Sequence, residues 1–140
     1  MKKIIAVLII VILAVMATGC SNKDTQLGGF YQSDFIGSNS DIVQISVNSD
    51  NGEFVQYISS RQVNSGIYRK NENGLYEFDG DVHSFTVILN EDDSFEVVIP
   101  KLNGDTPIIL NQINEDKSIF TTIGGQENYS DIEEYKDLLE

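Results

Sequence analysis

This 140-residue chain has few of the side chains that usually act as catalytic bases, thiol nucleophiles or zinc ligands. His83 and Cys20 are its single histidine and single cysteine, so a hydrolase built on a Ser or Cys nucleophile would depend on His83 as its base. His83 stands at an expected strand start beside Asp81 and Ser84, a position typical of a solvated edge residue. A zinc site would need several His or Cys ligands. We therefore expect no catalytic residues and no zinc.

Carboxylates are the remaining candidates. Glu77 and Asp79 are two positions apart, which places both on one face of a strand, where they could act as the acid and base of a glycosidase. With Asp81 they could instead bind calcium. The segment Asp79-Gly80-Asp81 is also typical of a hairpin turn. We expect no enzyme and no cofactor, and calcium binding stays open.

The elements that would position these residues are short strands. Between residues 27 and 123, apolar-rich segments alternate with turn residues every eight to twelve positions, which indicates antiparallel β structure. In one of them Val43, Ile45 and Val47 share a face. The turns carry Asn-Gly or Asp-Gly pairs, which tolerate positive φ. Strands are expected near 28–35, 42–48, 53–59, 63–70, 75–79, 82–89, 94–99, 107–113 and 118–123.

The C-terminal segment changes period. Ser130 and Glu133 have the spacing of a capping box. Apolar residues then recur at helical spacing: Ile132, Tyr135, Leu138 and Leu139. We predict one all-β domain over residues 28–140, an antiparallel up-and-down meander of eight or nine strands that forms a small barrel and ends in a short helix.

Three Gly-apolar-Tyr triplets begin at Gly29, Gly66 and Gly74, where a missing side chain lets a barrel strand bend. The first resembles the opening G-x-W of lipocalins, with Tyr31 in the Trp position. The segment "SGIYRKNENGLYEF" at 65–78 resembles a hairpin of small lipocalin-like bacterial lipoproteins. The resemblance implies an up-and-down barrel that holds a small apolar ligand. A β-sandwich or an open meander is the alternative fold.

Aromatic residues bear on whether such a barrel is hollow. Eight strands enclose an interior just wide enough to be filled by side chains or to hold one small ligand. Nine aromatic residues are candidates to fill it: Tyr31, Phe54, Tyr57, Tyr68, Tyr76, Phe78, Phe85, Phe95 and Phe120. This number favours binding on the exterior.

The N-terminus has the three zones of an export signal. Lys2 and Lys3 precede an apolar run at 4–16, and small residues follow at 17–19. Thirteen residues of helix reach roughly 20 Å, short of the ~30 Å hydrocarbon core that a spanning helix crosses. We therefore expect the segment to be removed. A cut at the small residues alone, which releases a secreted protein, and a retained membrane span are the alternatives.

The run "ATGC" at 17–20 resembles the lipobox of bacterial lipoproteins, in which the cysteine receives diacylglycerol and becomes the mature N-terminus. Gly19 and Cys20 match that pattern, while Ala17 stands where Leu is usual. The resemblance implies a signal peptide at 1–19, cleavage between Gly19 and Cys20, lipid on Cys20 and a flexible tether at 20–27. It places the domain on the extracytoplasmic face of the cell membrane.

Removal of residues 1–19 leaves seven Lys and Arg against 22 acidic residues, a formal charge of −15. Such a domain is repelled by nucleic acid and by anionic lipid headgroups. We expect a non-enzymatic binding module whose partner is a cationic protein, as for an inhibitor of a basic cell-wall hydrolase or an immunity factor. A small apolar ligand in the barrel and a structural role in the envelope are the alternatives.

Replacement of the lipidated residue tests the anchor. Cys20→Ser removes the thiol that accepts diacylglycerol, so we expect the full chain to incorporate labelled fatty acid only in the wild type. The variant should also shift from the membrane fraction or keep its signal. Equal label in the two proteins would contradict the lipobox interpretation.

Overall fold

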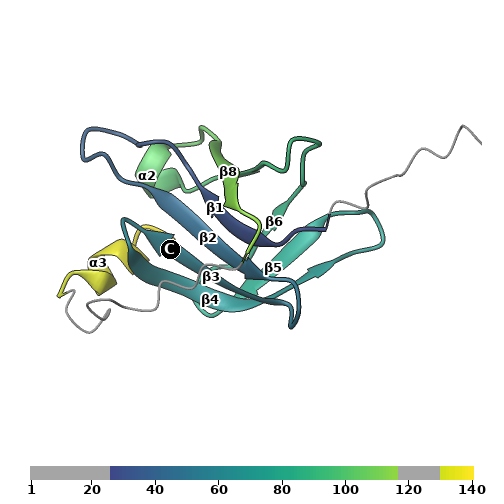
Figure 1. Cartoon of the computed structure of the whole chain (residues 1–140). Helices are drawn as coiled ribbons and strands as arrows, with labels where there is room; N and C mark the ends of the chain where they lie inside the picture. The colour runs from purple at the N-terminus through teal and green to yellow at the C-terminus, as the bar shows by residue number, and fades with distance from the viewer. Residues whose placement is uncertain (1–25, 117–129) are drawn as a thin grey trace, which may run out of the picture.

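The computed structural model describes residues 26–116 and 130–140, in which eight antiparallel strands form one sheet. The sheet curls into a nearly closed barrel (Figure 1). This confirms the expected small all-β barrel. The strands are β1 (Gly29–Gln32), β2 (Val43–Asn48), β3 (Glu53–Ile58), β4 (Arg61–Lys70), β5 (Tyr76–Gly80), β6 (Phe85–Val87), β7 (Phe95–Val97) and β8 (Ile108–Asn114). Two short helices accompany them, α2 (Pro100–Asn103) and α3 (Ile132–Lys136).

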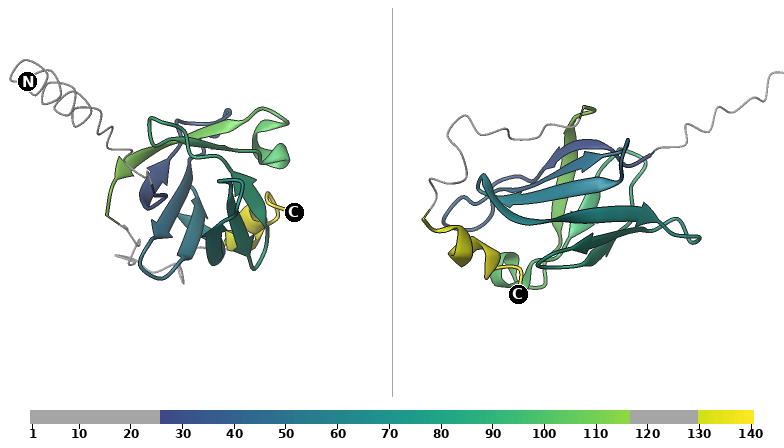
Figure 2. Two further views of the ribbon diagram at one scale, coloured as in Figure 1. Left: turned by 90° about the vertical axis from the view of Figure 1, so that its right-hand side faces the viewer. Right: turned by 90° about the horizontal axis from the view of Figure 1, so that it is seen from below.

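The strand order is that of an up-and-down barrel. It runs β6-β5-β4-β3-β2-β1-β8-β7, so each strand pairs with its neighbours in the chain except that β6 does not pair with β7, and β8 pairs with β1. Among the described strands, β6 and β7 are the two edges that share no ladder of hydrogen bonds. The two views of Figure 2 show the curled sheet from the side and from below. The barrel therefore has one seam, between β6 and β7.

The eight strands from 28 to 114 lie where the sequence predicts them, with shifted ends. The first stops at Gln32 instead of residue 35 because a loop over residues 33–42 begins there. After β7, Pro100 occupies the first turn of α2, where its missing N–H costs no hydrogen bond. The expected strand at 118–123 lies outside the described residues.

The predicted C-terminal helix is present, but its predicted capping box is wrong. Asp131, not Ser130, is the N-cap residue of α3, and no side chain caps the helix. The Asp131 carboxylate instead accepts two hydrogen bonds from Arg61, at 2.7 and 3.2 Å. A contact with β4 therefore positions the start of this helix.

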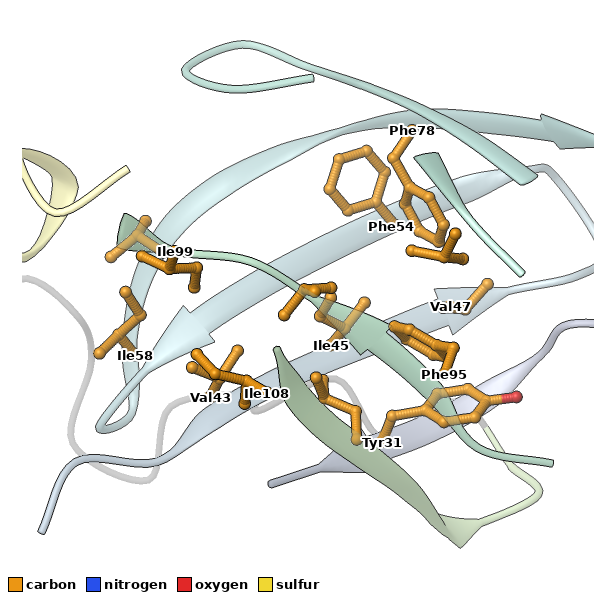
Figure 3. Packing of buried hydrophobic residues seen from close by; sticks show 14 of the residues in the cluster. Tyr31, Val43, Ile45, Val47, Phe54, Ile58, Phe78, Phe95, Ile99 and Ile108 are labelled. Carbon is orange, nitrogen blue, oxygen red and sulfur yellow. The ribbon is translucent and has the colours of Figure 1, made fainter. Parts of the chain in front are cut away.

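The barrel interior is filled by side chains that alternate along the strands (Figure 3). Val43, Ile45 and Val47 are all fully buried, as the period of two predicts. Seven of the nine aromatic candidates lie in this cluster or pack against it: Tyr31, Tyr68, Tyr76, Phe54, Phe78, Phe85 and Phe95. Tyr57 is buried outside the cluster because it alternates with Phe54 along β3. Phe120 lies outside the described residues.

Aromatic contacts cross the seam between β6 and β7. The Phe78 ring centroid lies 4.7 Å from that of Phe85 on β6 and 6.4 Å from that of Phe95 on β7. Phe95 in turn lies 4.8 Å from Tyr31, and Phe54 lies 4.9 Å from Phe78. Where hydrogen bonds between β6 and β7 are missing, the tilted Phe78–Phe95 pair joins the rings packed on one side of the seam to those on the other.

Two of the three triplet glycines permit a close approach of strands. A Cβ on Gly66 would meet the backbone carbonyl of Asp79 on β5, and one on Gly29 would meet that of Asn114 on β8. Gly29 also has a φ of +99°. Gly29 and Gly66 therefore have an architectural role, although what the structure shows is close packing of neighbouring strands and not the expected bend of one strand.

Truncation of the ring at the seam tests this account of closure. In the domain from Ser21 onward, Phe78→Ala should lower the free energy of unfolding by about 3–5 kcal/mol, because a buried ring with four aromatic neighbours is lost. Urea unfolding would measure it. Ile88→Ala, at a side chain 64% exposed, is the matched control and should change stability by less than about 0.5 kcal/mol. Equal effects would contradict the aromatic closure.

Candidate binding surfaces

His83 has no partner for catalysis among the described residues. Its ring stacks on Phe85, with centroids 6.0 Å apart and planes 13° from parallel, and its ring nitrogens make no hydrogen bond to a described side chain. The Ser84 hydroxyl donates to Asp79 instead, at 3.0 Å. The half-buried backbone of His83 is held by Asn64, whose amide nitrogen donates to the His83 carbonyl at 2.7 Å. His83 therefore contributes local packing on Phe85 and a hydrogen bond with Asn64.

The three candidate calcium ligands have separate partners. Glu77 accepts hydrogen bonds from Asn71 at 3.0 Å and Arg69 at 2.9 Å, and these two donors hold the pKa of Glu77 below its usual value. Asp81 accepts the backbone N–H of Ser65 at 2.8 Å. In the described parts of the chain, no three His, Cys, Asp or Glu side chains form a group that could hold a metal ion. Their arrangement does not favour the calcium hypothesis.

The two ends of the barrel differ in what they carry. We call the end where the described chain starts, at Gln26, the entry end, and the end with α2, α3 and the loop at 33–42 the far end (Figure 1). Gly19 and Cys20 lie outside the described residues. Within 26–116 and 130–140 there is no helix of the length and hydropathy that crossing a bilayer requires.

A cleft of about 330 Å³ opens at the entry end, lined by Tyr68, Tyr76, Arg69 and Lys70 among others. The Tyr68 hydroxyl donates to the Leu27 carbonyl at 2.9 Å, and the Leu27 N–H donates to the Tyr76 hydroxyl at 3.2 Å. Burial raises the pKa of Tyr68. The two tyrosine hydroxyls at this cleft therefore fasten Leu27 to the barrel.

The loop at 33–42 stands between two recesses of the far end. One, of about 230 Å³, lies between the loop and the helices and includes Asp41, Lys101, Glu134 and Tyr135. The other, of about 270 Å³, lies between the loop and the start of β8. Its lining residues are Ser33, Asp34, Phe35, Ile36, Gly37, Asn103, Pro107, Ile108 and Ile109.

Hydrogen bonds hold the loop in shape. The N–H of Ile36 donates to the carbonyl of Asp41 at 2.8 Å, and the reverse bond measures 3.1 Å. The Asp41 carboxylate accepts the hydroxyl of Ser59 at 2.8 Å, and the Ser33 hydroxyl accepts the N–H of Val43 at 3.0 Å. The loop is therefore tied to the barrel at its base and across its middle.

Arg61 fixes α3 against the same end. Its guanidinium contacts both oxygens of Asp131, donates to the Ser59 carbonyl at 2.7 Å and lies 4.5 Å from the centre of the Tyr135 ring. The hydrogen bonds from Arg61 hold the pKa of Asp131 below its usual value. Because a forked guanidinium restrains direction as well as distance, this contact sets the edge of the first recess.

Cations are few and engaged in the described residues, which contain five Lys and Arg against 20 Asp and Glu. Arg61, Arg69 and Lys136 form ion pairs. Lys101 donates to the carbonyl of Asp137 at 2.9 Å, and Lys70 lies 5.5 Å from the Tyr76 ring centre. The excess of carboxylates therefore determines the surface potential.

Comparison with protein families, characterised proteins and solved structures finds no match to this chain. The sequence did not predict the recess between the loop and the start of β8, because Phe35 was expected at the end of a strand. The segment at 33–41, "SDFIGSNSD", contains the available signal, since its polar residues and glycine interrupt the period of two.

Acid titration tests the attachment of α3. The lowered pKa of Asp131 means that its ion pair stabilises the fold above the usual Asp pKa and that this stability is lost as the pH falls through the lowered value. In the domain from Ser21 onward, the stability difference between wild type and Asp131→Asn should be full at about pH 5 and should shrink as the pH falls below the usual Asp pKa. Urea midpoints against pH would measure it.

Asp105→Asn is the charge-matched control for this titration. It removes one negative charge at the far end without breaking an ion pair of the described residues. A stability difference for Asp131→Asn that stays constant across the acid range would contradict the assigned role of the ion pair.

Proposed function

We propose that this protein is a lipid-anchored, extracytoplasmic binding module without enzymatic activity, which docks a cationic protein on its exterior. The observation that carries the proposal is the filled interior: Tyr31, Phe54, Phe78 and Phe95 occupy it and are almost fully buried. A barrel of this size has no room for both those rings and a ligand. Binding is then left to the exterior.

Charge supports a cationic partner. With a formal charge of −15 after removal of residues 1–19, the domain attracts basic proteins over long distances and repels acidic ones. The described residues contain only five Lys and Arg against 20 Asp and Glu, so these cations neutralise a small part of the negative charge. An inhibitor or immunity factor against a basic hydrolase or toxin is the class of function that fits this surface.

The proposed anchor would give the module an orientation. A tether over residues 20–27 extends at most about 25–30 Å from a lipid on Cys20. It joins the barrel at the entry end, so the far end is directed away from the membrane. Docking would then take place where a partner in the envelope has access.

The seam between β6 and β7 favours one second candidate. If the two edges separated, a small apolar ligand could enter between them, as in the lipocalin-like interpretation. That would displace Phe78 and Phe95 from each other. An accessory role in envelope structure needs no such opening. It predicts neither a bound cationic protein nor a bound apolar ligand.

Salt separates the two binding modes. The full chain, in vesicles of neutral lipid, is used to capture proteins and extractable small molecules from envelope extract. For a cationic protein, the association rate should fall steeply between 0.1 and 1 M salt, where the screening length drops from ~10 to ~3 Å, while the dissociation rate changes less. An apolar ligand should bind independently of salt with a negative heat-capacity change.

The identity of what is captured decides the outcome. Basic proteins that elute with salt would support docking on the exterior. Recovery of lipid or another small molecule, with no salt-eluted protein, would overturn the proposal and favour the lipocalin-like alternative.

A further inference from the structure

Phe35 is the most exposed large apolar side chain in the described part of the chain, at 73%. Single exposed apolar residues are ordinary, but this one belongs to a group. It lines the second far-end recess together with Pro107 and Ile109, and Ile109 is itself 52% exposed. Ile36 and Ile108, in the same lining, are buried. The recess therefore combines these apolar side chains with the polar Ser33, Asp34 and Asn103.

The loop presents Phe35 in a fixed frame. Its neighbour Ile36 forms the pair of backbone hydrogen bonds with Asp41, and its other side is tied down through Ser33. An aromatic anchor on a restrained loop loses little conformational entropy when a partner binds. Aromatic residues of this kind contribute a large share of the energy at protein interfaces.

The charges around the recess select the partner. The exposed Asp34 lines it, and Asp105 lies in the turn between the lining residues Asn103 and Pro107. No Lys or Arg is among its lining residues. A second copy of this chain would bring the same negative charge, so self-association is opposed. The complement is an apolar pocket rimmed by Lys or Arg.

We propose that the second far-end recess, between the loop at 33–42 and the start of β8, is the docking site for the cationic protein partner, with Phe35 as its anchor. The inference rests on the proposed function, since it says where on the exterior that partner binds. Phe35 inserts into an apolar pocket of the partner, while Asp34 and Asp105 face its basic rim. The site is at the end opposite Gln26, where the proposed tether would leave it accessible.

Site-specific crosslinking in cells tests the location with the full chain. The photoreactive residue p-benzoylphenylalanine replaces Phe35, Ile109, Ile67 or Ile88, one at a time. Ile67 on β4 and Ile88 after β6 are exposed to 55% and 64% and lie outside the recess lining, so they are matched controls. We expect one basic protein, identified by mass spectrometry, to crosslink at positions 35 and 109 and not at 67 or 88.

Affinity measurements with that protein give a second test. Phe35→Ser should weaken binding about 30-fold or more, as loss of an interface anchor does, and leave urea stability unchanged because the side chain is exposed. Asp34→Asn should mainly slow association and reduce its salt dependence. Ile88→Ser is the control and should bind like the wild type.

The outcomes separate the two proposals. A basic partner that crosslinks at 67 or 88 alone, or that binds Phe35→Ser normally, would overturn the location and leave the proposed function standing. An adduct with a second copy or with an acidic protein at position 35 would also overturn the location. Absence of a basic protein at all four positions, together with none in the salt eluate, would overturn both.

Discussion

Closure of the barrel across the seam between β6 and β7 is the constraint on which the rest of the structure depends. These two strands share no hydrogen-bond ladder, and the Phe78 ring packs near both Phe85 on β6 and Phe95 on β7, so ring packing joins the two sides. The same rings fill the interior. A barrel closed in this way has its interior filled by side chains, so a binding site is expected on its outer surface.

Two polar side chains, Asn64 and Arg61, attach a connection and a helix to that filled barrel. The Asn64 amide donates to the carbonyl of His83 and to the side chain of Gln56, and it accepts the N–H of Val82. These bonds hold the residues that connect β5 to β6, which lie outside the ladder between the two strands. Arg61 does the same for α3 through Asp131 and Ser59. Both satisfy backbone or charged groups that would be costly to bury alone.

Charge and shape then act at different distances. The acidic excess extends a field beyond the surface, which in the proposed docking mode would guide the approach of a basic partner without selecting a position on the surface. The far-end recess supplies the detail, through one exposed ring on a restrained loop. Affinity at interfaces comes mainly from such anchors, whereas surface charge chiefly sets the association rate. The proposed docking mode uses both.

The sequence by itself determined the inward face of β2, because the period of two along a strand needs no knowledge of the partner strand, and Val43, Ile45 and Val47 follow it. The expectation that Tyr57 helps to fill the interior was wrong, since this residue is buried outside the core cluster. Local turn chemistry likewise placed eight strands. The start of α3 depended on Arg61, 70 residues before Asp131, and the recess depended on the loop at 33–42 meeting β8. Only the tertiary structure could decide these contacts, since they join segments whose separation in the chain leaves no local pattern.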